Sequence, residues 1–348
     1  SYMIIGLYTL SANVKSSVNR LFVFLTSSLA IWSFAYSIAI AAPTAEESIF
    51  WNCFAVIGWG VFYSILLHFT LVLTRFESRL PKGIMLTLIY VPAAINIILF
   101  APFGYLAENQ YRMVQTDFGW VNIRPIDIGG VWFTIYYLVF LTANLVLLVR
   151  WWMRLESNTP LKRQATYFLH SVLVPIFLGI LTKTLPDLLG KNMYPRLVGI
   201  FMMVPIITLF FTSKKFGLLL EKETKTLRSQ DADRLRMFET IASIYIIGAP
   251  LSFLVGYFGV GRPLNYELTI STAILVIGLL TKLLPALTKN HILQNTVFVV
   301  QNRMAVLMYL RASNGSAAVP VCALCIMCVL FTVVLENGNY AVPCTVVI

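Results

Sequence analysis

The chain has 348 residues, of which 58% are hydrophobic and 12% are charged, and its formal net charge is +11. Its mean hydropathy is +0.79. Soluble domains are about 45–50% apolar and about 25% charged, so this composition excludes an ordinary soluble protein and a disordered one. Five Cys are too few, and odd in number, for a disulfide-built secreted scaffold. A polytopic membrane protein remains.

Apolar runs long enough to cross a bilayer recur along the chain. A spanning helix needs roughly 20 apolar residues. Runs without Asp, Glu, Lys or Arg lie at 21–45, 48–74, 83–107, 128–149, 164–182, 197–213, 240–261 and 312–335. A weaker run extends over 268–288, and shorter apolar stretches, 1–14 and 337–348, lie at the two ends. These runs predict an all-α, polytopic transmembrane helical bundle with about nine full spans plus partial helices at both ends, as in a piece of a longer protein.

The basic residues predict the orientation, because Lys and Arg concentrate in cytoplasmic loops. With the N-terminus outside, 20 of the 26 Lys and Arg residues lie on the cytoplasmic side. The other six are Arg112, Arg124, Lys183, Lys191, Arg196 and Arg262. We therefore expect a multi-pass protein of the plasma (inner) membrane with its N-terminus outside. This asymmetry accounts for the net charge, so no nucleic-acid partner is expected.

Two polar segments divide the chain. Residues 107–130 combine Tyr, Trp, Val and Ile with Gly and Pro, and predict a small outer β-hairpin large enough to form a lid. Residues 213–238 are charged and helix-prone, with seven basic and four acidic residues between 214 and 236. We expect a seven-helix unit at 1–212, a charged cytoplasmic linker helix at 213–238, and a second, truncated transmembrane unit at 239–348.

Residues 290–311 are too polar for a comfortable span, with Gln294, Asn295, Gln301 and Asn302 among aliphatic residues. We expect a helix that lies in the cytoplasmic interface. If this segment crossed the membrane, every later residue would change sides.

Lys183 and Asp187 are the strongest candidates for a site. They lie four residues apart, near the outer end of the sixth span. A charge inside a bilayer costs free energy unless it is paired or reaches the interface. Two interpretations stay open: a helix end anchored at the headgroups, or a pair that senses a ligand or ion beneath the lid. Tyr111 and Trp120 of the lid are further candidates for ligand contact.

His68 and His170 lie within the third and sixth spans, near their cytoplasmic ends. Each is either a hydrogen-bonded packing residue or a haem ligand or proton relay. The three cysteines at 322, 325 and 328 lie in an apolar helix without the fourth ligand that tetrahedral zinc needs. We expect no metal, no cofactor and no catalytic residues.

Several segments of residues 1–220 resemble, in their order, the N-terminal seven-transmembrane region of bacterial sensor histidine kinases. The segments are RLFVFLTSSLAIWSF (20–34), FWNCFAVIGWGVFYSILLHFTLVLT (50–74), FGW (118–120), IYYLVF (135–140), TLPDLLGKNMYPRLVGIFMMVPIITLFF (184–211) and KKFGLL (214–219). The resemblance implies a sensory input module that passes a signal to a cytoplasmic output domain. His291 lacks the acidic neighbour of a phosphoacceptor box, so a kinase would have to lie beyond residue 348.

The expected function is therefore a membrane-embedded sensory or receptor input module of histidine-kinase type. Its expected partners are the lipid bilayer, a small-molecule or peptide ligand of unknown identity, and a second copy of the chain in a homodimer. The alternative is a secondary transporter or other solute carrier. It rests on the similarity of GILTKTLPDL (179–188) to GLLTKLLPAL (278–287), which indicates either an inverted repeat or a chance match.

Overall fold

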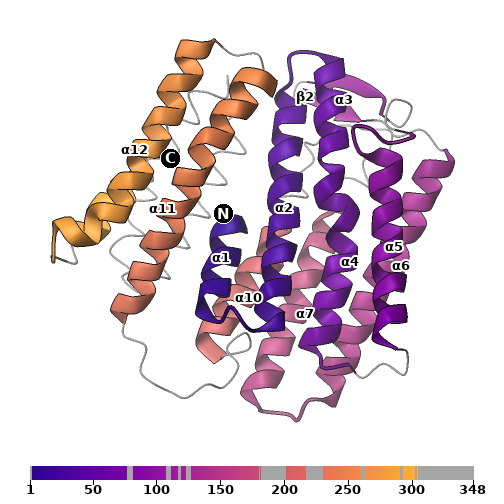
Figure 1. Cartoon of the computed structure of the whole chain (residues 1–348). Coiled ribbons are helices and arrows are strands. Elements are labelled where there is room, and N and C mark those ends of the chain that lie inside the picture. Colours follow the sequence, from indigo (N-terminus) through magenta and orange to yellow (C-terminus); the bar gives the residue numbers. More distant parts are fainter. Residues whose placement is uncertain are drawn as a thin grey trace. The chain divides into compact units, whose positions relative to one another are not determined.

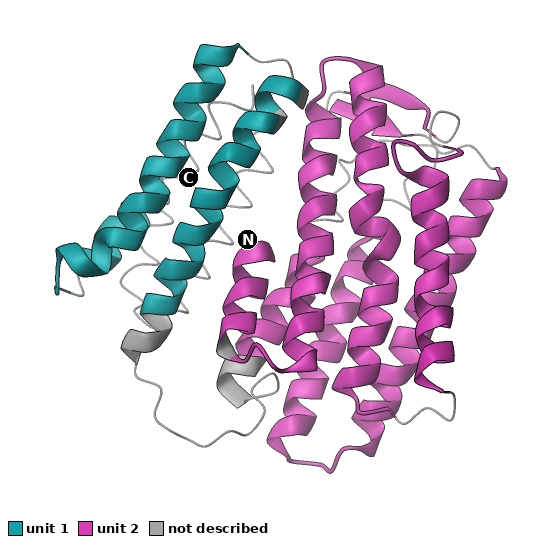
Figure 2. Ribbon diagram, viewed as in Figure 1, with its two compact units in different colours: residues 1, 224–348 teal, residues 2–223 magenta. Residues whose placement is uncertain are grey.

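The structure, a computed structural model, divides the chain into two units, residues 2–223 and residues 1 plus 224–348 (Figure 2). The described residues are 2–76, 81–106, 111–116, 119–122, 127–179, 181, 201–216, 230–259, 263–290, 293–301 and 304. The boundary at 223/224 lies within the expected linker. Its residues 217–229 are outside the described part of the chain.

We call residues 2–223 the seven-helix unit. Its described helices number seven when α3 and α4, which make one continuous apolar span, Ala45–Leu73, are counted as one. Its described helices are α1 (Tyr2–Ala12), α2 (Ser17–Ala41), α3 (Ala45–Phe54), α4 (Val56–Leu73), α5 (Lys82–Phe100), α6 (Ile128–Arg154), α7 (Pro160–Gly179) and α10 (Met203–Phe216) (Figure 1). Helix α4 is central and packs against α2, α5 and α6, while α1 and α7 both contact α10.

Side-chain caps determine where several of these helices begin. The Ser16 hydroxyl accepts a hydrogen bond from the Asn19 amide at 3.4 Å, before α2. Thr44 caps α3 through the Glu47 amide at 3.2 Å, and Asp127 caps α6 through the Gly130 amide at 2.7 Å. Such caps satisfy amide groups that have no partner within the helix.

The expected hairpin is confirmed. Strands β1 (Met113–Thr116) and β2 (Gly119–Asn122) pair antiparallel, with Met113 opposite Asn122 and Thr116 opposite Gly119. Gly119 has a φ of +98°, and a Cβ atom there would lie 2.3 Å from the Ile40 carbonyl oxygen of α2. Glycine is thus required at this position by both conformation and space.

The described part of the second unit contains two long helices, α11 (Gln230–Leu254) and α12 (Leu264–Leu287), which pack against each other. A π-helix, η2 (Val255–Gly259), follows α11. At Gly278 of α12, a Cβ atom would lie 2.9 Å from Tyr245 Cβ and 3.1 Å from the Ile246 amide nitrogen. The small residue therefore permits close approach of the two helices.

The expected count of about nine full spans is not confirmed. Among the described residues, six helices are long and apolar enough to cross a membrane: Ser17–Ala41, Ala45–Leu73, Lys82–Phe100, Ile128–Arg154, Leu235–Phe258 and Leu264–Leu287. Helix α7 begins with the polar residues Lys162, Arg163 and Gln164, which lower the apolar character of its first turns. The apolar helices Tyr2–Ser11 and Met203–Thr212 are shorter than a full span, and the expected span at 312–335 lies outside the described residues.

The expected boundaries also shift. Helix α10 extends to Phe216 and α11 begins at Gln230, so both enter the segment expected as a separate linker helix, 213–238. Helix-forming charged residues can continue a membrane helix into the aqueous phase, which a search for uncharged runs does not detect. Residues 293–301 are helical, and their expected position in the interface remains a prediction.

Gly58 allows α2 and α4 to approach at backbone distance. A Cβ atom at Gly58 would lie 2.4 Å from the Ser28 carbonyl oxygen and 2.5 Å from the Trp32 amide nitrogen. Both are backbone atoms of α2, so a side chain can be accommodated only if the two helices separate.

Replacement of Gly58 by Ala is expected to lower the free energy of unfolding by about 1–3 kcal/mol through overpacking. The measurement is thermal unfolding of the purified protein in detergent. Gly83→Ala in α5 is the matched control, because a Cβ atom at Gly83 would meet no other atom within 4 Å. That control should be neutral or stabilising by up to about 1 kcal/mol. Equal destabilisation by both substitutions would contradict the proposed contact.

Candidate functional site

A buried polar junction joins α4, α5 and α6 in the seven-helix unit. The Tyr136 hydroxyl of α6 donates to the Gly60 carbonyl oxygen at 3.1 Å and accepts from the Ser64 amide at 3.2 Å. In a regular α-helix the carbonyl of residue 60 and the amide of residue 64 bond to each other. The hydroxyl of α6 therefore contacts both members of one backbone pair of α4.

Three further side chains, those of Ser64, Asn96 and Trp132, complete this junction. Ser64 Oγ lies 3.0 Å from the Tyr136 hydroxyl oxygen and donates to the Ile89 carbonyl of α5 at 2.6 Å. Asn96 of α5 donates from Nδ2 to the Gly60 carbonyl at 3.0 Å and accepts at Oδ1 from Trp132 Nε1 of α6 at 2.9 Å. We call Gly60, Ser64, Asn96, Trp132 and Tyr136 the polar junction.

The polar junction fixes how the three helices pack. Ser64 and Asn96 are fully buried, and Tyr136 is 3% exposed. A buried polar group that loses its partner costs about 1–3 kcal/mol, so sliding any of the three helices leaves several groups unsatisfied at once. A contact inserted into the hydrogen-bond ladder is also a recognised cause of local helix bending. The junction is consequently a place where α4 has a preferred arrangement and a local weakness.

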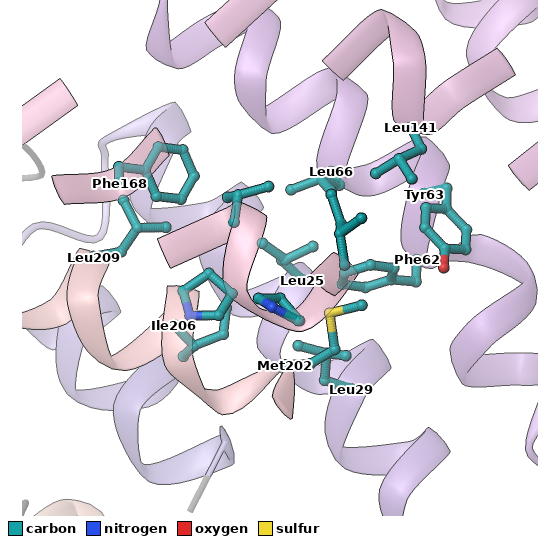
Figure 3. A pocket seen from close by; sticks show the side chains of 14 residues that line it. Leu25, Leu29, Phe62, Tyr63, Leu66, Leu141, Phe168, Met202, Ile206 and Leu209 are labelled. Carbon is teal, nitrogen blue, oxygen red and sulfur yellow. The ribbon is translucent and has the colours of Figure 1, made fainter. Parts of the chain in front are cut away.

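An apolar cavity of about 40 Å³ lies beside this junction, within the seven-helix unit (Figure 3). Side chains from α2, α4, α6, α7, α10 and the residue before α10 converge on it. They are Leu25, Leu29, Phe62, Tyr63, Leu66, Leu141, Phe168, Val172, Pro175, Ile176, Met202, Pro205, Ile206 and Leu209.

Tyr63 links the cavity to the polar junction. It lines the cavity and precedes Ser64 in α4. Its ring contacts that of Tyr136 edge to face, with the centroids 6.1 Å apart, and that of Tyr137 at 5.1 Å. A residue that lines the cavity is therefore in direct ring contact with Tyr136 of the junction.

The aromatic residues Tyr111 and Trp120 attach the hairpin to the helix ends. Trp120 Nε1 donates to the Ala42 carbonyl oxygen at 2.8 Å. Tyr111 is 7% exposed, packs against Cys53, and donates to the Asn52 carbonyl at 3.5 Å. In this arrangement the polar groups of both aromatic residues attach the hairpin to the ends of α2 and α3. A ligand that used them would have to compete with these bonds.

The structure places the two histidines on different helices. His68 Nδ1 of α4 lies 2.8 Å from the Tyr90 hydroxyl of α5. His170 of α7 is exposed, and its Nδ1 donates to the Thr166 carbonyl of the same helix at 2.7 Å. Among the described residues, neither imidazole contacts the other. Lys183 and Asp187 lie outside the described part of the chain.

The polar junction was not predicted from the sequence. A signal was present, because Ser64 and Asn96 are isolated polar residues within apolar runs and must find partners in a dry environment. The pairs Gly60–Ser64 and Trp132–Tyr136 are each spaced by four residues and so lie on one helix face. The missing information was which helix faces meet, and tertiary contacts alone supply it.

Tyr136→Phe removes the hydroxyl from the junction and should lower the free energy of unfolding by about 1–3 kcal/mol, because buried groups lose a partner. Thermal unfolding in detergent measures the effect. Tyr137→Phe is the matched control on the neighbouring residue. The Tyr137 ring contacts Tyr63, but its hydroxyl makes no hydrogen bond within the described residues, so the change should stay within about 0.5 kcal/mol. Equal effects of the two substitutions would show that the junction does not stabilise the bundle.

Comparison with known protein families gives one match over the seven-helix unit. The family model described as the N-terminal 7TM region of histidine kinase matches residues 1–219. No curated protein and no solved structure matches the chain. The resemblance expected over residues 1–220 is thereby confirmed, and the match includes every described helix from α1 to α10. Because the matched residues make up more than half of the chain, it belongs to the family of N-terminal seven-transmembrane regions of histidine kinases.

Proposed function

We propose that the seven-helix unit perceives a ligand and passes the signal to a cytoplasmic output domain outside this chain. The chain is a membrane protein and a histidine-kinase sensor region. This region of a histidine kinase is not itself catalytic, so phosphoryl transfer would belong to the output domain. The polar junction beside the apolar cavity is the observation that supports signal transmission.

The contacts support a route for the signal. The cavity is lined by Pro205, Ile206 and Leu209 of α10, and α10 is the helix from which the chain continues into the charged segment 213–238. A ligand shifts the balance between two helix packings only by the difference between its affinities for them. To change the ratio of the two packings from 1:99 to 99:1, the ligand must bind the second about 5.5 kcal/mol more tightly than the first. The free energy of several junction hydrogen bonds gained or lost together is of this order.

Orientation is part of the proposal: the hairpin faces outward and the α6–α7 turn faces the cytoplasm. Helix α6 runs from the hairpin end of the bundle to that turn (Figure 1). The ends of α6 and α7 on either side of the turn contain the basic residues Arg150, Arg154, Lys162 and Arg163, as expected beside a cytoplasmic loop. Lys162 Nζ also lies 3.9 Å from the centre of the Trp152 ring, a contact suited to a membrane interface.

Cysteine labelling tests the orientation. Val114→Cys in β1 and Asn158→Cys in the α6–α7 turn both replace exposed residues. On intact cells, a membrane-impermeant maleimide should label the first variant and not the second. Lysed cells provide the control, since both variants should then react. Labelling of Asn158→Cys alone on intact cells would invert the proposed topology.

The signalling proposal is tested at the pair expected from the sequence. Lys183→Met with Asp187→Asn removes both charges while it preserves much of the side-chain volume. We expect loss of the ligand-dependent change in phosphorylation when the protein is produced from its complete gene and assayed in membrane vesicles. An unchanged response would remove Lys183 and Asp187 from the proposed site. Solute uptake by reconstituted vesicles, without any phosphorylation response, would instead support the transporter alternative.

A further inference from the structure

We propose that the cavity between α2, α4, α6, α7 and α10 binds a short, uncharged alkyl group and that its occupancy biases the polar junction. The alkyl group belongs either to a free apolar molecule dissolved in the membrane or to the end of a lipid acyl chain. The inference rests on the proposed sensory function, because it names a ligand class for the same helices.

The chemistry of the lining selects an apolar occupant. Of the 14 lining residues, only Tyr63 has a polar side-chain atom. A stably bound water needs about two to four polar partners, and this lining cannot offer them. Apolar cavities of this kind stay dry and take up apolar molecules, as an engineered cavity of about 150 Å³ takes up benzene or xenon.

The size of the cavity restricts the occupant further. Its volume of about 40 Å³ is well below the roughly 150 Å³ of the engineered cavity that admits benzene. A chain end of very few carbons is therefore accommodated directly. A longer ligand requires the surrounding helices to move apart, and binding is then linked to helix movement.

One helix beside the cavity, α7, is suited to such movement. Pro175 lies inside α7 and lines the cavity. Proline has no amide hydrogen and displaces the preceding turn, so a helix bends most easily there. Pro205 of α10 also lines the cavity, but it lies in the first turn, where proline is tolerated. An occupant can thus displace the segment of α7 near Pro175 without breaking further hydrogen bonds.

The opposite wall transmits the displacement to the polar junction. Phe62, Tyr63 and Leu66 of α4 line the cavity on both sides of Ser64 in the sequence. Phe62 and Tyr63 contact each other, with their ring centroids 5.1 Å apart, and Tyr63 contacts Tyr136. An occupant therefore presses on the helix turn in which the Tyr136 hydroxyl contacts the backbone.

Photolabelling of the full chain tests this site. The purified protein is placed in phosphatidylcholine nanodiscs with one of two probes: a short dialkyl diazirine, or a phosphatidylcholine that has a diazirine at the end of one acyl chain. Labelled peptides are then identified by mass spectrometry. Labelling of cavity residues by the first probe alone indicates a free apolar molecule, and labelling by the second indicates a lipid chain. Absence of labelling at the cavity with both probes overturns the proposal.

Matched variants make the test specific. Val172→Leu extends a lining side chain by one carbon, whereas Val174→Leu makes the same change on the exposed side of α7. The first should lower cavity labelling about four-fold, the factor that corresponds to one buried methylene group, and the second should leave it unchanged. Equal labelling in these two variants overturns the proposal.

A pair of shortened side chains keeps the test valid if Val172→Leu fails to fold. Ile206→Ala enlarges the cavity and should increase labelling, while Ile207→Ala removes the same atoms from a residue that does not line it. Labelling requires no output domain, so failure of the proposed signalling function leaves these results unaffected. Conversely, a protein that signals normally but is not labelled at the cavity would overturn only this inference.

Discussion

The contact of one hydroxyl group with one turn of α4 determines how the centre of the seven-helix unit is arranged. In an apolar bundle the hydrophobic effect gives little preference between alternative helix packings, because lipid is as apolar as the helix surfaces. Directional hydrogen bonds make the distinction. Tyr136 contacts both the Gly60 carbonyl and the Ser64 amide, and Asn96 adds a third helix through the same carbonyl. The positions of α4, α5 and α6 are therefore specified by polar groups that no water can satisfy.

Cavity and junction have complementary roles in such a bundle. The junction favours one packing of the helices. In that packing, the side chains that line the cavity lack van der Waals contacts on one side. Tight cores have few alternatives of similar energy, whereas a small dry space leaves room for a second arrangement. A sensory module requires both properties, since its resting state must be defined and must also be displaceable by a modest binding energy.

The sequence predicted the class of fold well, because the span of a helix across lipid is a simple length requirement. The hairpin was also predictable, from the combination of Tyr, Trp, Val and Ile with Gly and Pro over residues 107–130. The number of spans was not, because α7 begins with Lys162 and Arg163 and α10 is short. The junction and cavity escaped prediction for a different reason. Both arise where Tyr136 meets Ser64 and where Leu29 and Phe168 line the same space, pairs of residues far apart in the chain whose proximity no local pattern encodes.

The close approach at Gly58 also has a mechanical meaning. With a Cβ absent at this position, the backbones of α2 and α4 touch without any intervening side chain that could change rotamer. Sideways movement between the two helices is therefore restricted at this contact, and α2 and α4 move together. The hairpin is hydrogen-bonded through Trp120 to Ala42, at the end of α2. A displacement of the hairpin is then passed directly to α4, whereas α5 and α7 each contain an internal proline, Pro92 and Pro175, at which a helix bends more easily.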